Sequence, residues 1–143
     1  MSSDWAKRLA SDKKQQIESR QLQQEKDLSD RKMLQAHSGK MWEAVCKAMD
    51  QAAKQLSNEM NDPEHITAYR IGPQLVLIRR KSSTNQYPVE FDPGTWTITT
   101  QDDSYCLKVM DGNGVAWGHS AGSEIYTEKE VAQIEVERVF KSG

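Results

Sequence analysis

Cysteine and long apolar runs are scarce in this 143-residue sequence, and each scarcity excludes a class of protein. Two cysteines, Cys46 and Cys106, are too few for the disulfide framework of a small secreted domain. No apolar run approaches the ~20 residues that a membrane-spanning helix needs, and the polar N-terminus lacks the apolar stretch of a signal peptide. We therefore expect a soluble, cytoplasmic protein with reduced thiols and no membrane association.

An excess of one charge sign is also missing, because 19 Lys and Arg residues face 21 Asp and Glu residues. The net charge of −2 argues against a nucleic-acid partner, since such proteins usually carry a strongly basic surface. Hydrophobic residues make up 36% of the chain, which indicates that a polar segment dilutes an ordinary core. The length fits one domain plus an appendage.

Proline and glycine are unevenly distributed and divide the chain at Asn61-Asp62-Pro63. The segment from Ser3 to Asn61 has no proline and one glycine, Gly39, whereas all four prolines and seven of the eight glycines follow Asp62. This distribution predicts a helical first half and a strand-rich second half. We therefore predict the α+β class, with a helical arm over residues 1–38 and an α+β body over residues 39–143.

Residues 41–60 show the clearest helical periodicity. At 100° per residue, apolar side chains fall in one stripe and most charged side chains fall on the opposite side. The stripe contains Met41, Val45, Met49, Ala52 and Leu56. Gly39 permits either a continuous or an interrupted helix, so residues 4–60 form one bent helix or two helices.

The second half alternates apolar and polar residues in short segments separated by turn signals, which predicts an antiparallel β-meander of five or six strands. The candidate strands are residues 66–71, 75–81, 87–91, 95–101 and 105–110, and a last strand that begins at Val115. Asp111-Gly112-Asn113-Gly114 is typical of a hairpin turn. The apolar face of this sheet needs a cover, and the 41–56 stripe is the clearest amphipathic candidate.

The C-terminal segment carries a helix start signal. Thr127 and Glu130 have the spacing of a capping box, which predicts a helix from Glu128 to about Phe140 packed with the sheet. Residues 134–137 also alternate as a strand would, so a strand is the alternative there.

The sequence contains no recognisable catalytic or metal-binding constellation. His37, His65 and His119 are isolated, and none has a second His or Cys at ligand spacing. Nucleophile-elbow and phosphate-loop motifs are also missing. We therefore predict no catalytic residues, no metal and no cofactor, although an enzyme whose site is assembled from distant residues remains an alternative.

Residues 79–81 form the strongest positive cluster. Strand alternation sends Arg79 and Lys81 to one face and Arg80 to the other. The cluster is either a solvated strand end or an anion site. An anion site leads to our alternative function, a module that binds a small, nucleotide-like anion with the help of aromatic side chains of the sheet. The candidate ligand-binding residues are Arg79, Arg80, Lys81, Trp96, Trp117 and His119.

Residues 4–36 combine many helix formers with few large apolar side chains, which do not repeat in heptads. Such a helix gains little from propensity alone in water, so it either packs on a partner or frays. Our leading hypothesis is therefore a non-enzymatic assembly protein, in which this segment binds a second copy, giving a homodimer, or another protein. The candidate interface residues are Trp5, Leu9, Ile17, Leu28 and Leu34.

Overall fold

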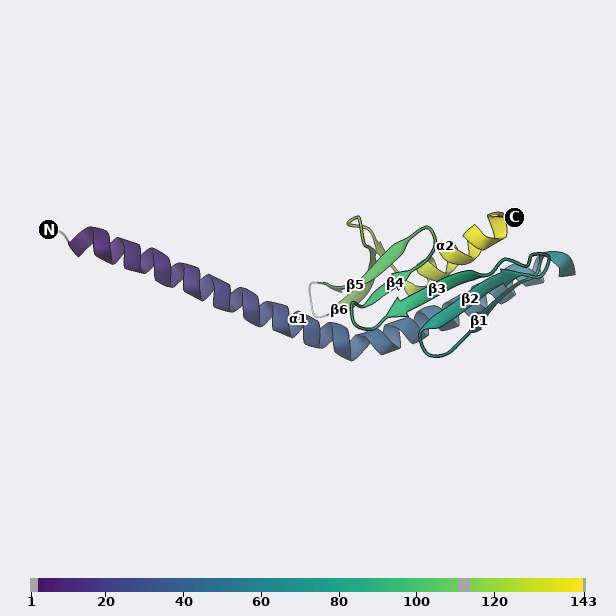
Figure 1. Ribbon diagram of the computed structural model, residues 1–143, viewed down its shortest axis with the longest axis horizontal. Helices are drawn as coiled ribbons and strands as arrows, with labels where there is room; N and C mark the ends of the chain where they lie inside the picture. The colour runs from purple at the N-terminus through teal and green to yellow at the C-terminus, as the bar shows by residue number, and fades with distance from the viewer. Residues whose placement is uncertain (1–2, 111–113, 143) are drawn as a thin grey trace. The chain divides into compact units, whose positions relative to one another are not determined.

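The computed structural model describes residues 3–110 and 114–142 (Figure 1). Helix α1 (Ser3–Asn58) is followed by a short 3-10 helix (Asp62–Glu64), a sheet, and helix α2 (Glu128–Lys141). The strands are β1 (Ile66–Arg70), β2 (Leu75–Arg80), β3 (Tyr87–Asp92), β4 (Thr97–Thr99), β5 (Ser104–Met110), β6 (Gly114–His119) and β7 (Ile125–Tyr126). The predicted α+β class is confirmed.

The sheet is an antiparallel meander, as predicted, with strands in the order β1-β2-β3-β4-β5-β6-β7. The seven strands formed by the described residues exceed the expected five or six. The additional strand is β7, whose two residues pair with Trp117 and Gly118 and are too short to show alternation. The predicted hairpin turn at 111–114 lies largely outside the described residues.

The chain divides into two compact units, an N-terminal unit of Met1–Met33 and a second unit of Leu34–Gly143. The open choice between one helix and two is decided in favour of one, because α1 continues through Gly39. A glycine inside a helix costs about 1 kcal/mol relative to alanine. Burial of the neighbouring residues Ser38 and Trp42 helps the helix to tolerate this cost.

Within the second unit, the predicted stripe of α1 lies in the core together with the apolar side of the sheet. Trp42 stacks on Phe91 of β3 with ring centroids 5.3 Å apart, and its indole N–H donates to the Pro73 carbonyl at 2.8 Å. Arg70 of β1 adds a bidentate ion pair to Glu43 of α1, with N–O distances of 2.6 and 2.8 Å. These contacts fix the helix on the sheet.

Ser57, near the end of α1, closes part of the free edge of β1. Because β1 stands at one end of the strand order, one side of this strand has no strand partner. The Ser57 hydroxyl accepts from the Ile66 amide at 2.9 Å and donates to the Ile66 carbonyl at 3.0 Å. One side chain thus satisfies both outward backbone groups of Ile66.

The C-terminal segment is a helix rather than a strand, and its predicted capping box is present. The Thr127 hydroxyl accepts from the Glu130 amide at 3.2 Å, and the Glu130 carboxylate accepts from the Thr127 amide at 3.1 Å. Helix α2 packs against β2 and β7. Its buried residues are Val131, Ala132, Glu135, Val136 and Val139.

The strand predicted over residues 95–101 is shorter than expected. Trp96 has a φ of 53°, in the left-handed region that side chains other than glycine seldom adopt, and β4 begins after it at Thr97. The Trp96 carbonyl still accepts from the Leu107 amide at 3.0 Å. Trp96 therefore belongs to the turn before β4, and its side chain packs at the border of the core.

Candidate functional site

The positive cluster at residues 79–81 does not form a single anion site. Arg79 donates through Nε to the Ser83 carbonyl at 3.1 Å, and Lys81 forms an ion pair with Asp62. Arg80 has the opposite orientation and donates to the Phe140 carbonyl at 3.0 Å. Arg79 and Lys81 line one surface hollow, and Arg80 lines a different one.

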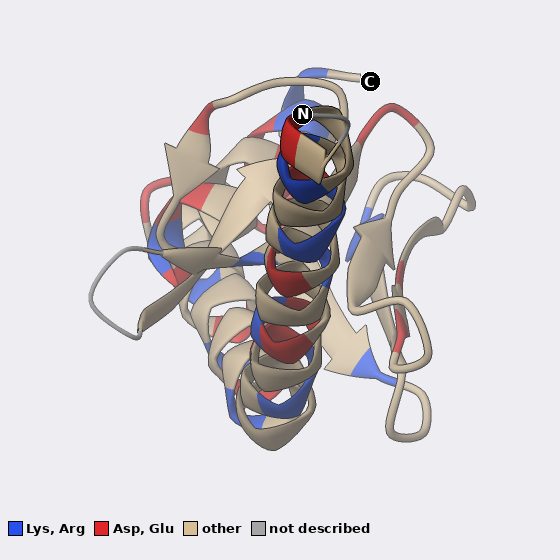
Figure 2. Ribbon diagram, turned by 90° about the vertical axis from the view of Figure 1, so that its left-hand side faces the viewer, with Lys and Arg blue, Asp and Glu red and all other residues tan. Residues whose placement is uncertain are grey.

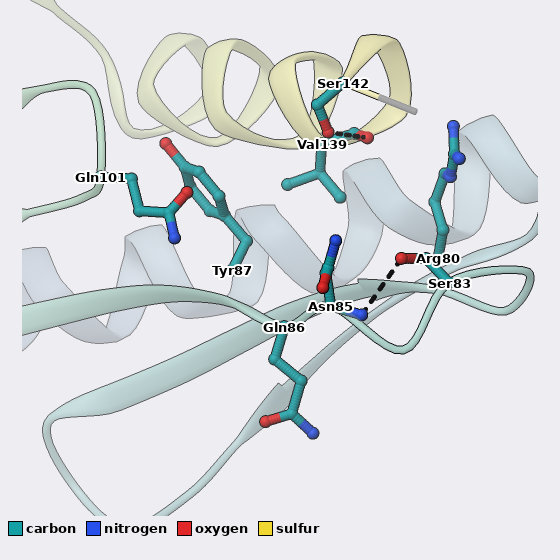
Figure 3. Close-up of a pocket in the computed structure, with 8 residues that line it drawn as sticks. All are labelled: Arg80, Ser83, Asn85, Gln86, Tyr87, Gln101, Val139 and Ser142. Carbon is teal, nitrogen blue, oxygen red and sulfur yellow. Dashed lines mark hydrogen bonds between the residues drawn. The ribbon is translucent and has the colours of Figure 1, made fainter.

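We call the second hollow the Arg80 pocket (Figure 3). It has a volume of about 360 Å³ and lies between the end of β2, the following loop, the start of β3 and the end of α2. The register that pairs Ile78 with Tyr87 brings Arg80 and Tyr87 to the same side of the sheet. Its lining residues are Arg80, Ser83, Asn85, Gln86, Tyr87, Gln101, Val139 and Ser142.

Polar groups dominate this lining, and Arg80 is the one charged residue that the described part of the chain contributes to it. The Ser83 hydroxyl accepts from the Asn85 amide at 3.1 Å, and the Ser142 hydroxyl donates to the Val139 carbonyl at 2.9 Å. Gln86 points away from the other side chains in Figure 3, because it donates to the Tyr69 hydroxyl at 3.1 Å. Its side chain therefore contributes little to the pocket.

A buried polar network adjoins the pocket through Tyr87. The fully buried Glu135 carboxylate accepts from the Tyr105 hydroxyl at 2.6 Å and from the Tyr87 hydroxyl at 2.9 Å. Arg138 lies 3.6 Å from the same carboxylate. Burial, followed in size by the interaction with Glu135, raises the pKa of Tyr105 strongly. Both phenols therefore act as neutral donors at ordinary pH.

His119 belongs to a second part of this network. Its Nδ1 accepts from the Ala121 amide at 3.2 Å, so Nε2 carries the hydrogen that bonds Asp103 at 2.7 Å. Asp103 also pairs with Arg138. Burial alone would raise the Asp103 pKa, but hydrogen bonds from His119 and Arg138 outweigh it and lower this pKa. With both ring nitrogens occupied, His119 is held as a structural link.

The two tryptophans predicted to bind a ligand occupy different environments. Trp117 is fully buried in the core and makes an edge contact with Phe91 at 6.2 Å between ring centroids. Trp96 is partly buried at the core border. The six predicted ligand residues are thus spread over several places, and their ligand role stays a prediction.

The cysteines are both free and lie on different elements. Cys46 is buried on the inner face of α1, and this burial raises its pKa to about 11, so its thiol is protonated at neutral pH. Cys106 is half-buried in β5, where Thr97 and Gly118 lie opposite it on the neighbouring strands. Among residues 3–110 and 114–142, no three His, Cys, Asp or Glu side chains cluster as metal ligands would.

The N-terminal unit exposes the apolar side chains that we predicted as an interface. Trp5 is 65% exposed, Leu9 63%, Ile17 44% and Leu28 56%. Leu22, which the predicted stripe omits, is also exposed. Acidic and basic residues alternate along the helix (Figure 2). Leu34 differs from the other four, because it packs against the core of the second unit.

Sequence reasoning missed the polar residues of the Arg80 pocket and the Glu135 network. Asn85, Gln101 and Ser142 are ordinary loop residues, and no local signal marks them. Glu135 carries a signal, because it lies one helical turn after Val131 and one before Val139 on an otherwise apolar face of α2. A carboxylate in that position indicates buried partners from another element.

None of the described helices has the length and apolarity of a membrane span. Comparisons with protein-family models, with curated proteins and with solved structures find no match to this chain.

Proposed function

We propose that this chain is a non-enzymatic assembly protein whose N-terminal unit pairs with that of a second copy. The supporting observation is that residues 3–29 are all exposed, including Trp5, Leu9, Ile17 and Leu28. Most helical stability in proteins comes from packing of an apolar face rather than from propensity. Burying these apolar side chains against a partner stabilises the helix by roughly 25 cal/mol per Å² of apolar surface.

A second copy is the simplest partner for this surface. Homodimers with two-fold symmetry are the commonest protein assemblies, and they let the same apolar stripe serve on both sides of the interface. The mixed charge pattern of the helix places neither a strongly acidic nor a strongly basic field along it (Figure 2). Like-charge repulsion therefore does not prevent two such helices from pairing.

The test is a mass measurement by light scattering on the full chain and on two matched variants. Leu9→Glu with Leu28→Glu places two carboxylates in the apolar stripe. Gln15→Glu with Ser29→Glu adds the same charge on the opposite side of the helix. We expect the wild type and the second variant to be dimers and the first variant to be a monomer.

Two outcomes contradict the proposal. A wild-type monomer at every concentration removes self-association. If the variant with Leu9→Glu and Leu28→Glu still has the mass of a dimer, the predicted interface is wrong.

A further inference from the structure

Beyond assembly, we propose that the Arg80 pocket binds a small molecule that presents a carboxylate or a phosphate. The site is new relative to the positive cluster predicted from the sequence, because Arg79 and Lys81 lie outside it. The argument depends on the charge of Arg80, on the donors around it and on the size of the pocket.

Arg80 is half-buried, and no carboxylate of the described residues forms an ion pair with its guanidinium. Arg138, which is similarly buried, has Asp103 as its partner. A guanidinium has five N–H donors, and the Phe140 carbonyl takes one of those of Arg80. The remaining donors suit the two oxygens of a carboxylate or phosphate.

The end of helix α2 opposes this attraction only in part. A helix C-terminus carries about half a negative charge, whereas arginine carries a full positive charge. The Phe140 carbonyl already bonds Arg80, and no aspartate or glutamate of residues 3–110 and 114–142 lines the pocket. Glu135 and Asp102 accept from the Tyr87 hydroxyl, so Arg80 is the charged side chain that faces the pocket among the described residues.

Neutral donors complete the site. The side-chain amides of Asn85 and Gln101 have no hydrogen-bond partner among the described residues, and in the view of Figure 3 they stand on either side of the Tyr87 ring. Because the Ser83 hydroxyl oxygen accepts from the backbone N–H of Asn85, the Ser83 hydroxyl hydrogen is available to a ligand. The volume of about 360 Å³ lies near the lower end of ligand pockets, so the ligand is small.

The experiment is an NMR titration of the full chain with sodium acetate, with sodium phosphate and with acetamide, at constant ionic strength. Acetamide has the shape of acetate without its charge. We expect saturable shifts of the Asn85 and Gln101 side-chain amides with acetate, phosphate or both, and none with acetamide. The stronger of the two anions identifies the ligand group as carboxylate or phosphate.

Matched arginine variants locate the site. Arg80→Gln should weaken binding at least tenfold, whereas Arg79→Gln, which removes the same charge on the opposite face, should leave it unchanged. If Arg80→Gln unfolds the chain, Asn85→Ala with Gln101→Ala replaces it, since both side chains are exposed. This double variant should weaken binding severalfold.

The proposal is overturned if neither anion gives saturable shifts. It is also overturned if acetamide binds as acetate does, or if Arg79→Gln weakens binding as much as the pocket variants do. None of these outcomes bears on the mass of the wild type, so this proposal and the assembly proposal fail independently.

Discussion

At the scale of single residues, Glu135 has the most demanding environment in the second unit. Its side chain is fully buried, and burying a carboxylate costs several kcal/mol unless hydrogen bonds compensate for the lost water. Tyr87 and Tyr105 supply two such bonds, and Arg138 supplies a nearby positive charge. Each of these partners therefore matters more to stability than an ordinary surface hydrogen bond.

Replacing Tyr105 by Phe should lower the free energy of unfolding by about 1–3 kcal/mol, because it removes one donor to a buried carboxylate. Tyr126→Phe makes the same chemical change at a hydroxyl that bonds the exposed Glu124, and it should cost much less. Urea unfolding followed by circular dichroism measures both. An equal loss of unfolding free energy in the two variants would show that the buried hydrogen bond of Tyr105 stabilises the chain no more than the exposed one of Tyr126.

Stability should fall as the pH rises above about 10. Burial raises the folded-state pKa of Tyr87 and Tyr105 above the ordinary value of 10.0, so the unfolded chain loses these protons first. The contribution is complete below pH 10 and is lost as the pH rises towards the raised folded pKa. Urea midpoints between pH 8 and about 11 should drop in the wild type and drop less in Tyr105→Phe. A parallel fall in both would exclude this residue as the cause.

At the scale of elements, the helices were predictable because their signals are local. The apolar stripe of residues 41–56 and the Thr127–Glu130 box each lie within a few turns of one helix, where periodicity and capping act directly. β7 and the Trp96 turn were not predictable, because pairing with β6 and a φ of 53° depend on the folded sheet. The Glu135 network has partners 30 and 48 residues away, so only the fold assembles it.

Thr127→Ala should destabilise the chain by about 1 kcal/mol, because it removes the side-chain acceptor at the start of α2. Thr84→Ala is the matched control, since Thr84 is exposed in a loop outside the helices and strands. Thermal unfolding of both variants provides the measurement. A Thr127→Ala variant as stable as the control would show that packing of α2 makes the cap dispensable.

At the scale of the whole molecule, the two units differ in how far their side chains are buried. Among residues 3–110 and 114–142, every buried residue belongs to Leu34–Gly143, whereas residues 3–33 of the N-terminal unit include none. Sequence composition already indicated this contrast, through the sparse apolar residues of the first segment. The Arg80 pocket was not predictable at this scale, since it forms only when the loop after β2 meets the end of α2.

Residues 34–143 alone should fold with a melting temperature within about 4 °C of the body transition of the full chain, which corresponds to less than about 1 kcal/mol. A shorter fragment, residues 42–143, should melt distinctly lower, because it lacks Leu34 and Met41, which pack against the core. Differential scanning calorimetry compares the three. A large loss already in the first fragment would show that the N-terminal unit stabilises the core.

The two hydrogen bonds between Ser57 and Ile66 limit how copies of this protein can associate through the edge of the sheet. They occupy the outward amide and carbonyl of Ile66, and the next outward residue, Ala68, is buried. A neighbouring chain therefore finds no open backbone ladder at this end of the sheet on which to stack. Strand addition at this edge would first require the end of α1 to separate from β1, which disfavours amyloid-like growth there.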